Sequence, residues 1–308
     1  MTDGSLRLLV TGASGFVGSN IVEACRRLHG DELITDRVDL LDATAIADHV
    51  TATTPDGVIH SAIINDWDAM VADRRTAWAA YVDSTKAYAE ACDRAGIPFV
   101  LVSTDWVYDG TQGPAPEDEP PNPVNPYGFL KAASELVALD RNGSVARVSG
   151  VNGSHWGGRE VPRAQDHGFG YFVSSLVDTL GGGKPFHVWE GDGLVNTVAS
   201  PSLGTMCGEV MRGVVAERLT GVFHCCGADA VSRRQLARTA VEVFELDGEL
   251  LTFGPPPEVA PMPIPADTSL DATASARRLG YRLPSITELL SAYRRERSDG
   301  TVTPFVTT

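Results

Sequence analysis

The sequence lacks long apolar runs and lacks an excess of basic residues. None of the apolar runs in its 308 residues approaches the roughly 18 residues that a membrane-spanning helix needs, and the first five residues are polar. We therefore expect no membrane partner and no secretory signal. Lys and Arg total 25 against 40 Asp and Glu, which gives a formal net charge of −15. A nucleic-acid backbone repels such a chain, so DNA and RNA are excluded as expected partners.

Cysteine is also sparse, and its pattern argues against a disulfide framework. The five cysteines form an odd set without a CxxC spacing, and only Cys225 and Cys226 are adjacent. These features indicate reduced thiols and a cytoplasmic location. A vicinal redox switch at the adjacent pair is the alternative, but a strand-like run around them favours buried small hydrophobic residues. His155, Asp166 and His167 repeat no metal-ligand spacing, so no metal is predicted.

The chain instead carries an alternation of short apolar runs and helical patterns. Hydrophobic residues make up 43% of it, enough to bury a sizeable core. The first half predicts strands at 7–11, 32–35, 57–61, 99–103 and 145–149, with helices at 16–28, 44–50, 76–95 and 127–139. Buried-type strands separated by helices indicate βαβ units, and therefore an α/β fold with a Rossmann-like, doubly wound parallel sheet.

The pattern changes after residue 151. A stretch at 152–170, rich in glycine and charge, is long enough to predict a functional loop or lid. Further on, the sequence predicts helices at 171–180, 201–215, 233–244, 273–279 and 286–297, a strand at 222–226 and an extended segment at 254–265. The tail at 298–308 shows no periodicity and is expected to be loose.

A glycine-rich turn follows the first predicted strand and leads directly into a helix. Glycine at 12, 15 and 18 permits a tight turn, close approach of the backbone to a pyrophosphate and close helix packing, while the helix N-terminus faces the phosphates. A merely structural turn is the alternative reading. The residues predicted to bind a dinucleotide here are Gly12, Ser14, Gly15, Phe16, Val17 and Gly18.

The position of this motif predicts how the chain divides into two domains. We predict an NAD(P)-binding Rossmann domain over residues 1–150, to which strands and helices near 195–226 return. Residues 151–308 are predicted to form a smaller, interleaved C-terminal domain that mainly binds substrate.

The second predicted strand ends beside Asp36 and Arg37. An acid at this position binds the ribose hydroxyls of NAD, whereas an arginine favours the 2′-phosphate of NADP. Because the sequence supplies both, the choice between NADP and NAD stays open. Asp39 and Leu40 either lie beside the adenine or belong to a helix cap that precedes Thr44.

A hydroxyl pair, Ser103 and Thr104, ends the fourth predicted strand, and Tyr127 and Lys131 follow at positions i and i+4 of a helix. This spacing places the tyrosine and the lysine on one helix face. A phenol, with a free pKa of about 10, becomes a competent acid–base group beside an ammonium, and a hydroxyl holds a substrate oxygen. The YxxxK spacing is common by chance, but together with the glycine loop it predicts proton relay to a carbonyl.

With these motifs in place, the chain resembles the extended short-chain dehydrogenases/reductases, and most closely the dTDP-4-dehydrorhamnose reductase family. The segment TGASGFVG resembles the family's cofactor loop, STDWVYDG its segment after the fourth strand, and EDEPPNPVNPYGFLKAASE its entry into the YxxxK helix. The closing segment LDATASARRLGYRLP extends the similarity over nearly the whole chain.

The resemblance implies roles for particular residues. Tyr127 would donate a proton, Lys131 would lower the pKa of the tyrosine and hold the nicotinamide ribose, and Thr104 would hydrogen bond to the keto oxygen. The further residues implied at the cofactor are Ser61, Ala62, Ile63 and Ser103, and those at the substrate are Asp105, Trp106 and Trp156. The implied partners are a nucleotide-sugar substrate and a second copy of the chain in a homodimer.

Departures from the family pattern leave the sugar open. Trp106 stands where relatives often have tyrosine, Asp83 where asparagine is common, and Asn196 with Thr197 where a Pro-Thr pair is usual. The candidates for a diphosphate clamp are Arg159, Arg163, Lys184, Arg233 and Arg234. Each of these basic residues alone is more typical of a solvated surface.

The first functional hypothesis is an NADPH- or NADH-dependent reductase acting on the keto group of a nucleotide-activated deoxysugar. The second hypothesis is epimerisation or dehydration of a sugar nucleotide. Of these two reactions dehydration has less support, because Asp105 is followed by Trp106 and not by a second acid. A non-catalytic, NAD(P)-binding regulatory protein and a reductase of another carbonyl compound complete the alternatives.

Overall fold

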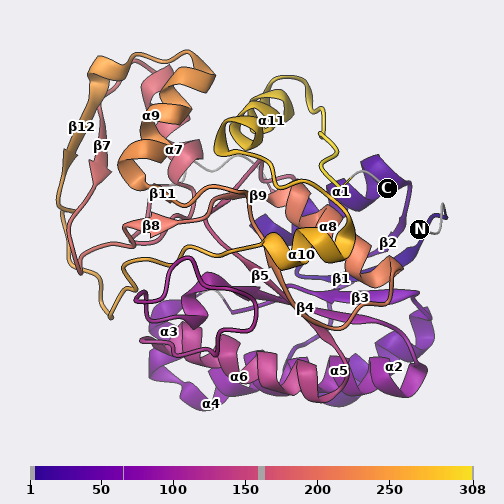
Figure 1. The fold of residues 1–308 in the computed structure, drawn as a ribbon. Coiled ribbons are helices and arrows are strands. Elements are labelled where there is room, and N and C mark those ends of the chain that lie inside the picture. Colours follow the sequence, from indigo (N-terminus) through magenta and orange to yellow (C-terminus); the bar gives the residue numbers. More distant parts are fainter. Residues whose placement is uncertain (1–3, 65, 159–163, 307–308) are drawn as a thin grey trace.

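The computed structural model describes residues 4–64, 66–158 and 164–306. Six parallel strands form the central sheet in the order β10-β5-β4-β3-β1-β2 (Figure 1). Their bounds are β1 (Arg7–Thr11), β2 (Glu32–Ile34), β3 (Gly57–His60), β4 (Phe99–Thr104), β5 (Ser144–Val148) and β10 (Gly221–Cys225). The predicted α/β fold with a parallel, Rossmann-like sheet is therefore confirmed.

Helices cover both faces of this sheet, because the strands are apolar on both sides. Along β1, Leu8 and Val10 enter the core on one face, whereas Leu9 enters a separate core on the other. In Figure 1 the two helix layers lie above and below the sheet. The first layer contains α1 (Phe16–His29) and α8 (Gly204–Ala216), and the second contains α2 (Ala43–Thr53), α5 (Ser84–Ala95) and α6 (Pro126–Asp140).

The helix predicted at 76–95 is longer and less regular than expected. It begins as α4 (Arg74–Trp78), passes through one turn of π-helix, η1 (Ala79–Asp83), and continues as α5. Asp73 caps its start, where the carboxylate accepts hydrogen bonds from the Thr76 N–H and hydroxyl. A short preceding helix, α3 (Trp67–Ala72), has too few residues to show a helical period.

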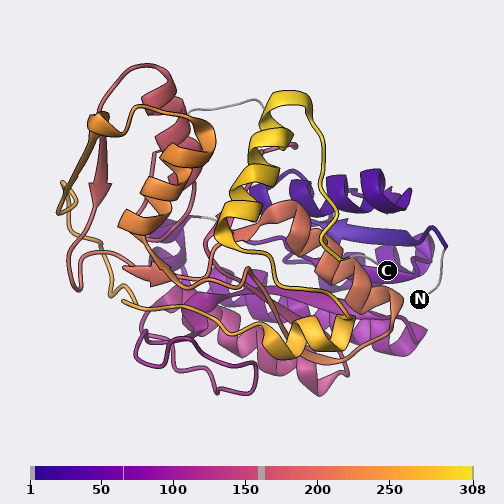
Figure 2. The same cartoon turned by 45° about the horizontal axis from the view of Figure 1, so that its top comes forward.

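Strand β10 and helix α8 of the C-terminal half belong to the sheet and its helix layer, whereas the part that contains the next strand pair and helices α7 (Phe172–Gly181) and α9 (Arg233–Phe244) projects from one end of the sheet in Figure 2. Strand β7 (Phe186–Trp189) pairs in parallel with β12 (Leu251–Gly254), and only Gly254 of the segment predicted as extended lies in this ladder. The other pairs join β6 (Val151–Asn152) to β9 (Ser202–Leu203) and β8 (Val198–Ala199) to β11 (Val231–Ser232). The other helices of this half are α10 (Thr273–Leu279) and α11 (Ile286–Asp299). Two short 3₁₀ turns, η2 (Asp105–Val107) and η3 (Gly248–Leu250), complete the elements.

The expectation of a loose tail is wrong for the described part of that segment. Val302 and Val306 are buried, and the backbone N–H of Phe305 donates to Glu209 Oε2 at 2.8 Å. Arg27 donates to the carbonyl of Gly300 at 2.9 Å. Single apolar residues that dock on a distant helix leave no periodic signal, so the sequence pattern missed this packing.

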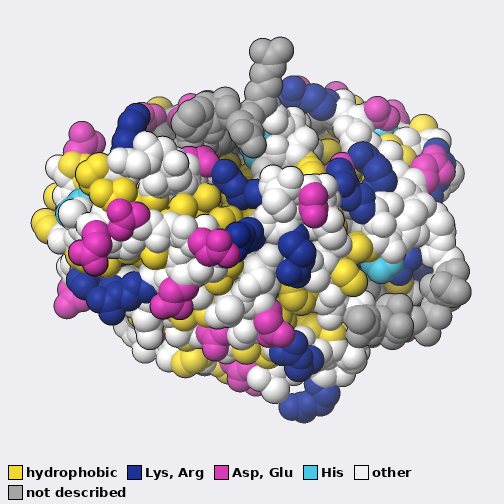
Figure 3. Space-filling view, turned by 90° about the horizontal axis from the view of Figure 1, so that it is seen from above, with side chains coloured by type: hydrophobic (Ala, Val, Ile, Leu, Met, Phe, Trp, Pro, Cys, Tyr) yellow, Lys and Arg dark blue, Asp and Glu magenta, His cyan; other side chains and the backbone are white. Residues whose placement is uncertain are grey.

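Acidic and basic side chains are interspersed on the face of the molecule seen in Figure 3. Ion pairs such as Arg234 with Glu190 and Arg297 with Asp178 combine the two signs on the C-terminal elements. Among the residues that the structure describes, no helix is long and apolar enough to cross a membrane.

Candidate active site

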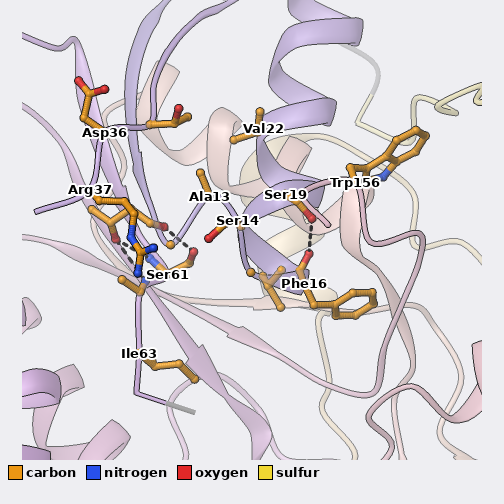
Figure 4. Close-up of a pocket in the computed structure, with 18 of the residues that line it drawn as sticks. Ala13, Ser14, Phe16, Ser19, Val22, Asp36, Arg37, Ser61, Ile63 and Trp156 are labelled. Carbon is orange, nitrogen blue, oxygen red and sulfur yellow. Dashed lines mark hydrogen bonds between the residues drawn. The ribbon is translucent and has the colours of Figure 1, made fainter. Parts of the chain in front are cut away.

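A cavity of about 790 Å³ opens at the carboxyl ends of β1, β2 and β3, and we call it the glycine-loop pocket. Cavities of this size are typical of small-molecule and cofactor sites. Most of the residues predicted at the cofactor line it (Figure 4): Gly12, Ser14, Gly15, Phe16, Val17, Gly18, Asp36, Arg37, Leu40, Ser61, Ala62 and Ile63.

The glycines of this pocket are required by space as well as by backbone conformation. Gly12 has a φ of +69°, and a Cβ there would lie 2.7 Å from the backbone nitrogen of Ala62. A Cβ at Gly18 would lie only 2.1 Å from the carbonyl oxygen of Gly12. The turn therefore brings backbone and the N-terminus of α1 together without side chains between them. This cradle fits the pyrophosphate of a dinucleotide.

Threonine and serine side chains fasten β1 to β3 beside the loop. The Thr11 hydroxyl accepts hydrogen bonds from the backbone N–H groups of Ser61 and Ala62, each at 3.2 Å. The Ser61 hydroxyl donates to the Thr11 carbonyl at 2.7 Å. These bonds fix the floor of the pocket.

Asp36 and Arg37 both line the glycine-loop pocket, but they point in different directions. The Asp36 side chain is 79% exposed and lies 3.8 Å from His49 Nε2. The Arg37 side chain points inward, towards Ser61, in Figure 4, whereas the Asp36 carboxylate points away. Arg26 also lines the pocket and is paired with Glu23 at 2.6 Å.

The structure places Asp39, Ser103 and Trp156 outside their predicted sites. Asp39 accepts a hydrogen bond from the Leu41 N–H, and it is Asp42 that caps α2. The Ser103 hydroxyl donates to the buried carboxylate of Glu135 at 2.5 Å, away from the described lining of either pocket. Trp156, predicted at the substrate, lines the glycine-loop pocket instead.

Trp156 reaches that place through contacts with α1. Its ring nitrogen donates to Asn20 Oδ1 at 3.2 Å, and the guanidinium of Arg27 lies 4.7 Å from its ring centroid. His155 on the same loop contacts the carbonyl of Ser14 at 3.0 Å. Residues 155–157 of the predicted loop therefore lie over the glycine turn. Arg159 and Arg163 lie outside the described residues.

A second cavity of about 270 Å³, which we call the tyrosine pocket, adjoins the first. Phe16, Val17 and Ile63 line both cavities. The tyrosine pocket contains the predicted Thr104, Asp105, Trp106 and Tyr127. Residues from remote segments complete its lining, among them Asp66, Tyr81, Asp166, Gly168 and Asn196.

Tyr127 stands on the first turn of α6, with its hydroxyl close to the end of β4. Asn125 caps this helix by accepting a hydrogen bond from the Gly128 N–H at 3.0 Å, and Pro126 occupies the first helical position. Burial raises the pKa of Tyr127 to about 12, while a hydrogen bond with Thr104 opposes the shift. Trp106 packs edge to face against the phenol, with ring centroids 6.3 Å apart.

Lys131 lies one helical turn after Tyr127 and is 4% exposed. Its Nζ donates to the carbonyl of Val102 on β4 at 2.8 Å and lies 5.6 Å from the ring centroid of Tyr81. Burial lowers the pKa of Lys131 to about 8, and the nearby Glu135 carboxylate partly offsets this effect. The ammonium is thus held between β4 and the Tyr81 ring, and Lys131 is absent from the described lining of both pockets.

Asp105 is buried at the start of η2 and is surrounded by hydroxyl groups. It accepts hydrogen bonds from Ser149 at 2.7 Å, Thr268 at 2.6 Å and Thr104 at 3.1 Å. Burial raises the pKa of Asp105 to about 6 against the effect of these bonds. Sequence reasoning missed Thr268 because 163 residues separate it from Asp105.

Contrary to the prediction that no second acid accompanies Asp105, the described lining of the tyrosine pocket contains further carboxyl groups. Asp166, on the long loop, also lines the tyrosine pocket, where its carboxylate accepts a hydrogen bond from the Gly170 N–H at 3.1 Å. Arg233, one of the candidates for a diphosphate clamp, is buried and bound within the protein. Its guanidinium donates to the carbonyls of Asn196 and Asp166, each at 2.9 Å. Its neighbour Arg234 pairs with Glu190, and Lys184 is exposed.

All five cysteines are buried, unpaired thiols.

The fold and the two adjoining pockets define an NAD(P)-dependent oxidoreductase of the extended short-chain dehydrogenase/reductase class. The family model of the RmlD substrate binding domain matches residues 6–297, and the chain belongs to this family.

Relatives agree over most of its length. The probable low-salt glycan biosynthesis reductase Agl14 of Haloferax volcanii is 26% identical over 306 residues, with 94% of this chain and 98% of that protein covered. A dTDP-4-dehydrorhamnose reductase of Sinorhizobium fredii is 25% identical over 297 residues, with 91% and 94% covered. The crystal structure of the dTDP-4-dehydrorhamnose reductase of Bacillus anthracis in complex with NADP superimposes with a TM-score of 0.78. That structure is 19% identical, with 95% of this chain and 99% of the other covered, and it shows the common fold.

Proposed function

We propose that this chain reduces the keto group of a nucleotide-activated deoxysugar, with NADPH or NADH as hydride donor and Tyr127 as proton donor. The observation that carries the proposal is the Thr104–Tyr127 pair in the tyrosine pocket, which adjoins a cradle suited to a dinucleotide. The names of the relatives, which include dTDP-4-dehydrorhamnose reductases, support a nucleotide sugar as the substrate.

The nicotinamide supplies the hydride, so the chain's own residues must align the carbonyl and deliver a proton. Tyr127 keeps its proton at neutral pH, because burial raises its pKa to about 12. The Thr104 hydroxyl, within hydrogen-bonding reach of that phenol, would bind the keto oxygen. Lys131 would stabilise the phenolate left after transfer, and would hold the nicotinamide ribose after leaving the Val102 carbonyl.

We further propose that the donor is NADPH in preference to NADH. Arg37 points into the glycine-loop pocket while the Asp36 carboxylate points out of it (Figure 4). Arg26, in the same lining, adds a second guanidinium at this end. A guanidinium directed inward suits a 2′-phosphate, to which it donates paired hydrogen bonds.

The division of labour between residues 1–150 and 151–308 is part of the same proposal. The glycine-loop pocket draws on the first part except at Trp156, Gly157 and Tyr171. The tyrosine pocket adds residues between Val151 and Asn196 from the second part. A cytoplasmic location is also proposed, because the buried thiols require no oxidising compartment.

A homodimer is the proposed assembly, formed through the face that α3, α4 and α6 share. An apolar groove of about 450 Å³ lies there, and Trp78, Phe129 and Leu136 on these helices are 41%, 57% and 69% exposed. Light scattering of the wild type is expected to give twice the chain mass, and Phe129→Asp the mass of one chain. A wild type with the mass of a single chain at micromolar concentration would overturn the dimer.

The function is tested by titrating the protein with NADPH and NADH, followed by a screen of 4-keto deoxysugar nucleotides on the same sample. Oxidation of the bound cofactor by any of these substrates is the expected result. Tight cofactor binding without turnover across the panel would contradict the reductase, and absence of cofactor binding would contradict the assignment of the glycine loop as well.

A further inference from the structure

The π-helical turn η1 faces the helix that carries Tyr127 and Lys131, and hydroxyl groups tie it in place. The Thr85 hydroxyl donates to the carbonyl of Tyr81 at 2.6 Å, and the Ser84 hydroxyl donates to that of Ala80 at 2.6 Å. From α6, the Ser134 hydroxyl donates to the same Tyr81 carbonyl at 3.0 Å. Single π-turns inside helices are rare and frequently lie at functional sites. Here the turn is fastened to the reactive helix at the position of Tyr81.

The Tyr81 side chain is held at both ends. Its ring is 3% exposed and lines the tyrosine pocket, with its centroid 6.3 Å from that of Tyr127 at an interplanar angle of 81°. Its hydroxyl donates to the carbonyl of Ile64 at 2.9 Å, next to Ile63 in the lining of both pockets. The ring therefore cannot turn away without breaking a buried hydrogen bond.

Lys131 is the charged group that this ring faces, with Nζ 5.6 Å from the ring centroid. Among the described residues no ion pair reaches that ammonium, and its one hydrogen bond goes to the neutral carbonyl of Val102. The nearest carboxylate, Glu135 on the same helix, is itself bound by the Arg147 guanidinium at 2.7 Å. His60, from β3, is neutral because burial and the nearby lysine lower its pKa to about 3.

A buried ammonium without an ion pair needs another source of stabilisation. The face of an aromatic ring carries negative electrostatic potential and attracts a cation within about 6 Å of its centroid, more strongly where water is excluded. We propose that Tyr81 is a positioning residue whose ring keeps Lys131 charged and in place beside Tyr127. This role deepens the proposed reductase function, in which a charged Lys131 supports proton transfer from Tyr127.

The chain allows a direct test that needs neither cofactor nor substrate. It contains only three lysines, and Lys86 and Lys184 are exposed. Lysine labelled with ¹³C at Cε gives three signals, of which a Lys131→Met variant assigns the buried one. The Lys131 signal is expected to titrate near pH 8 in the wild type, since burial lowers its pKa to about 8.

Variants of Tyr81 separate the ring from its hydroxyl. Tyr81→Phe keeps the ring, so the Lys131 titration is expected to stay where it is. Tyr81→Leu removes the ring and is expected to lower the titration midpoint by about one pH unit. A midpoint that Tyr81→Leu leaves unchanged would overturn the proposal, as would an equal shift in both variants, which would assign the effect to the hydroxyl.

If Tyr81→Leu does not fold, fluorinated phenylalanine at position 81 provides a second test of the ring. Fluorine withdraws negative potential from the ring face and keeps the ring shape, so the Lys131 midpoint should fall stepwise with each added fluorine. A midpoint independent of fluorination contradicts the role of the ring. In the active enzyme the high-pH limb of kcat is expected to shift in parallel with the Lys131 midpoint. Absence of turnover in the wild type would contradict the proposed reductase function. The Lys131 titration would still test the proposed role of Tyr81.

Discussion

The glycine-loop pocket and the tyrosine pocket share a wall but are built in different ways. Most of the first comes from residues between Thr11 and Tyr88, and its shape depends on backbone and on the absence of side chains at Gly12 and Gly18. The second gathers side chains from segments as far apart as Phe16 and Asn196. A short stretch of chain therefore encodes the cofactor cradle, whereas the substrate side depends on long-range packing.

Charge also distinguishes the two pockets. Arg26 and Arg37 line the glycine-loop pocket together with Glu23 and Asp36, so its lining carries both signs of charge. The described lining of the tyrosine pocket contains the carboxyl groups of Asp66, Asp105 and Asp166 and no lysine or arginine. Changes in the two pockets should therefore separate cofactor binding from turnover and from sugar recognition.

The largest effect is expected from Tyr127→Phe, which removes the phenolic proton and leaves the glycine-loop pocket intact. A positioned general acid contributes roughly 10²–10⁴-fold to rate, so kcat should fall by about 10³-fold. Steady-state turnover and an NADPH fluorescence titration measure the two properties separately. Retained turnover would show that the tyrosine pocket does not hold the proton donor.

Gly18→Ala tests the glycine-loop pocket. Its Cβ would lie 2.1 Å from the Gly12 carbonyl oxygen, so the turn must shift at a cost of about 3 kcal/mol, which corresponds to roughly 100-fold weaker NADPH binding. Gly181→Ala is the matched control, because a Cβ there meets nothing within 4 Å. Equal affinity for NADPH in the two variants would break the argument from backbone crowding.

Arg37→Ala sharpens the comparison within the glycine-loop pocket. Loss of a charge-assisted contact to a 2′-phosphate, about 2 kcal/mol, should weaken NADPH binding roughly 30-fold and leave NADH binding unchanged. Asp36→Ala serves as the control, since that carboxylate is 79% exposed. Calorimetric titration with both cofactors measures the ratio, and a parallel loss for NADH would contradict selection by Arg37.

The smallest effect is expected from Gly168→Ala on the substrate side. Its Cβ would lie 2.9 Å from the Trp106 ring, so the ring must move by a fraction of an ångström in the tyrosine pocket. An increase of about fivefold in KM for the sugar nucleotide, equivalent to about 1 kcal/mol, should follow without a change in NADPH affinity. Steady-state kinetics checks this, and an unchanged KM would place the sugar away from Trp106.

Local patterns in the sequence were sufficient for the six strands of the central sheet and for the longer helices, but not for α3 or the short strand pairs. Helices at 233–244 and 273–279 agree with the predicted bounds. The first begins at a capping box in which Ser232 and Gln235 exchange hydrogen bonds, a signal contained in four residues. Gly12, Tyr127 and Thr104 were equally predictable, since each lies at the end of a strand or the start of a helix with a recognisable spacing.

The sequence by itself determined the parallel sheet, the glycine cradle and the Tyr127–Lys131 face, because helix and strand periods and tight turns depend on neighbouring residues. Only the tertiary structure decided that Asp166 enters the tyrosine pocket, that Trp156 covers the glycine turn and that Tyr81 faces Lys131. Those contacts join segments that are tens of residues or more apart in the sequence. Contacts between such distant segments produce no local periodic pattern from which they could be predicted.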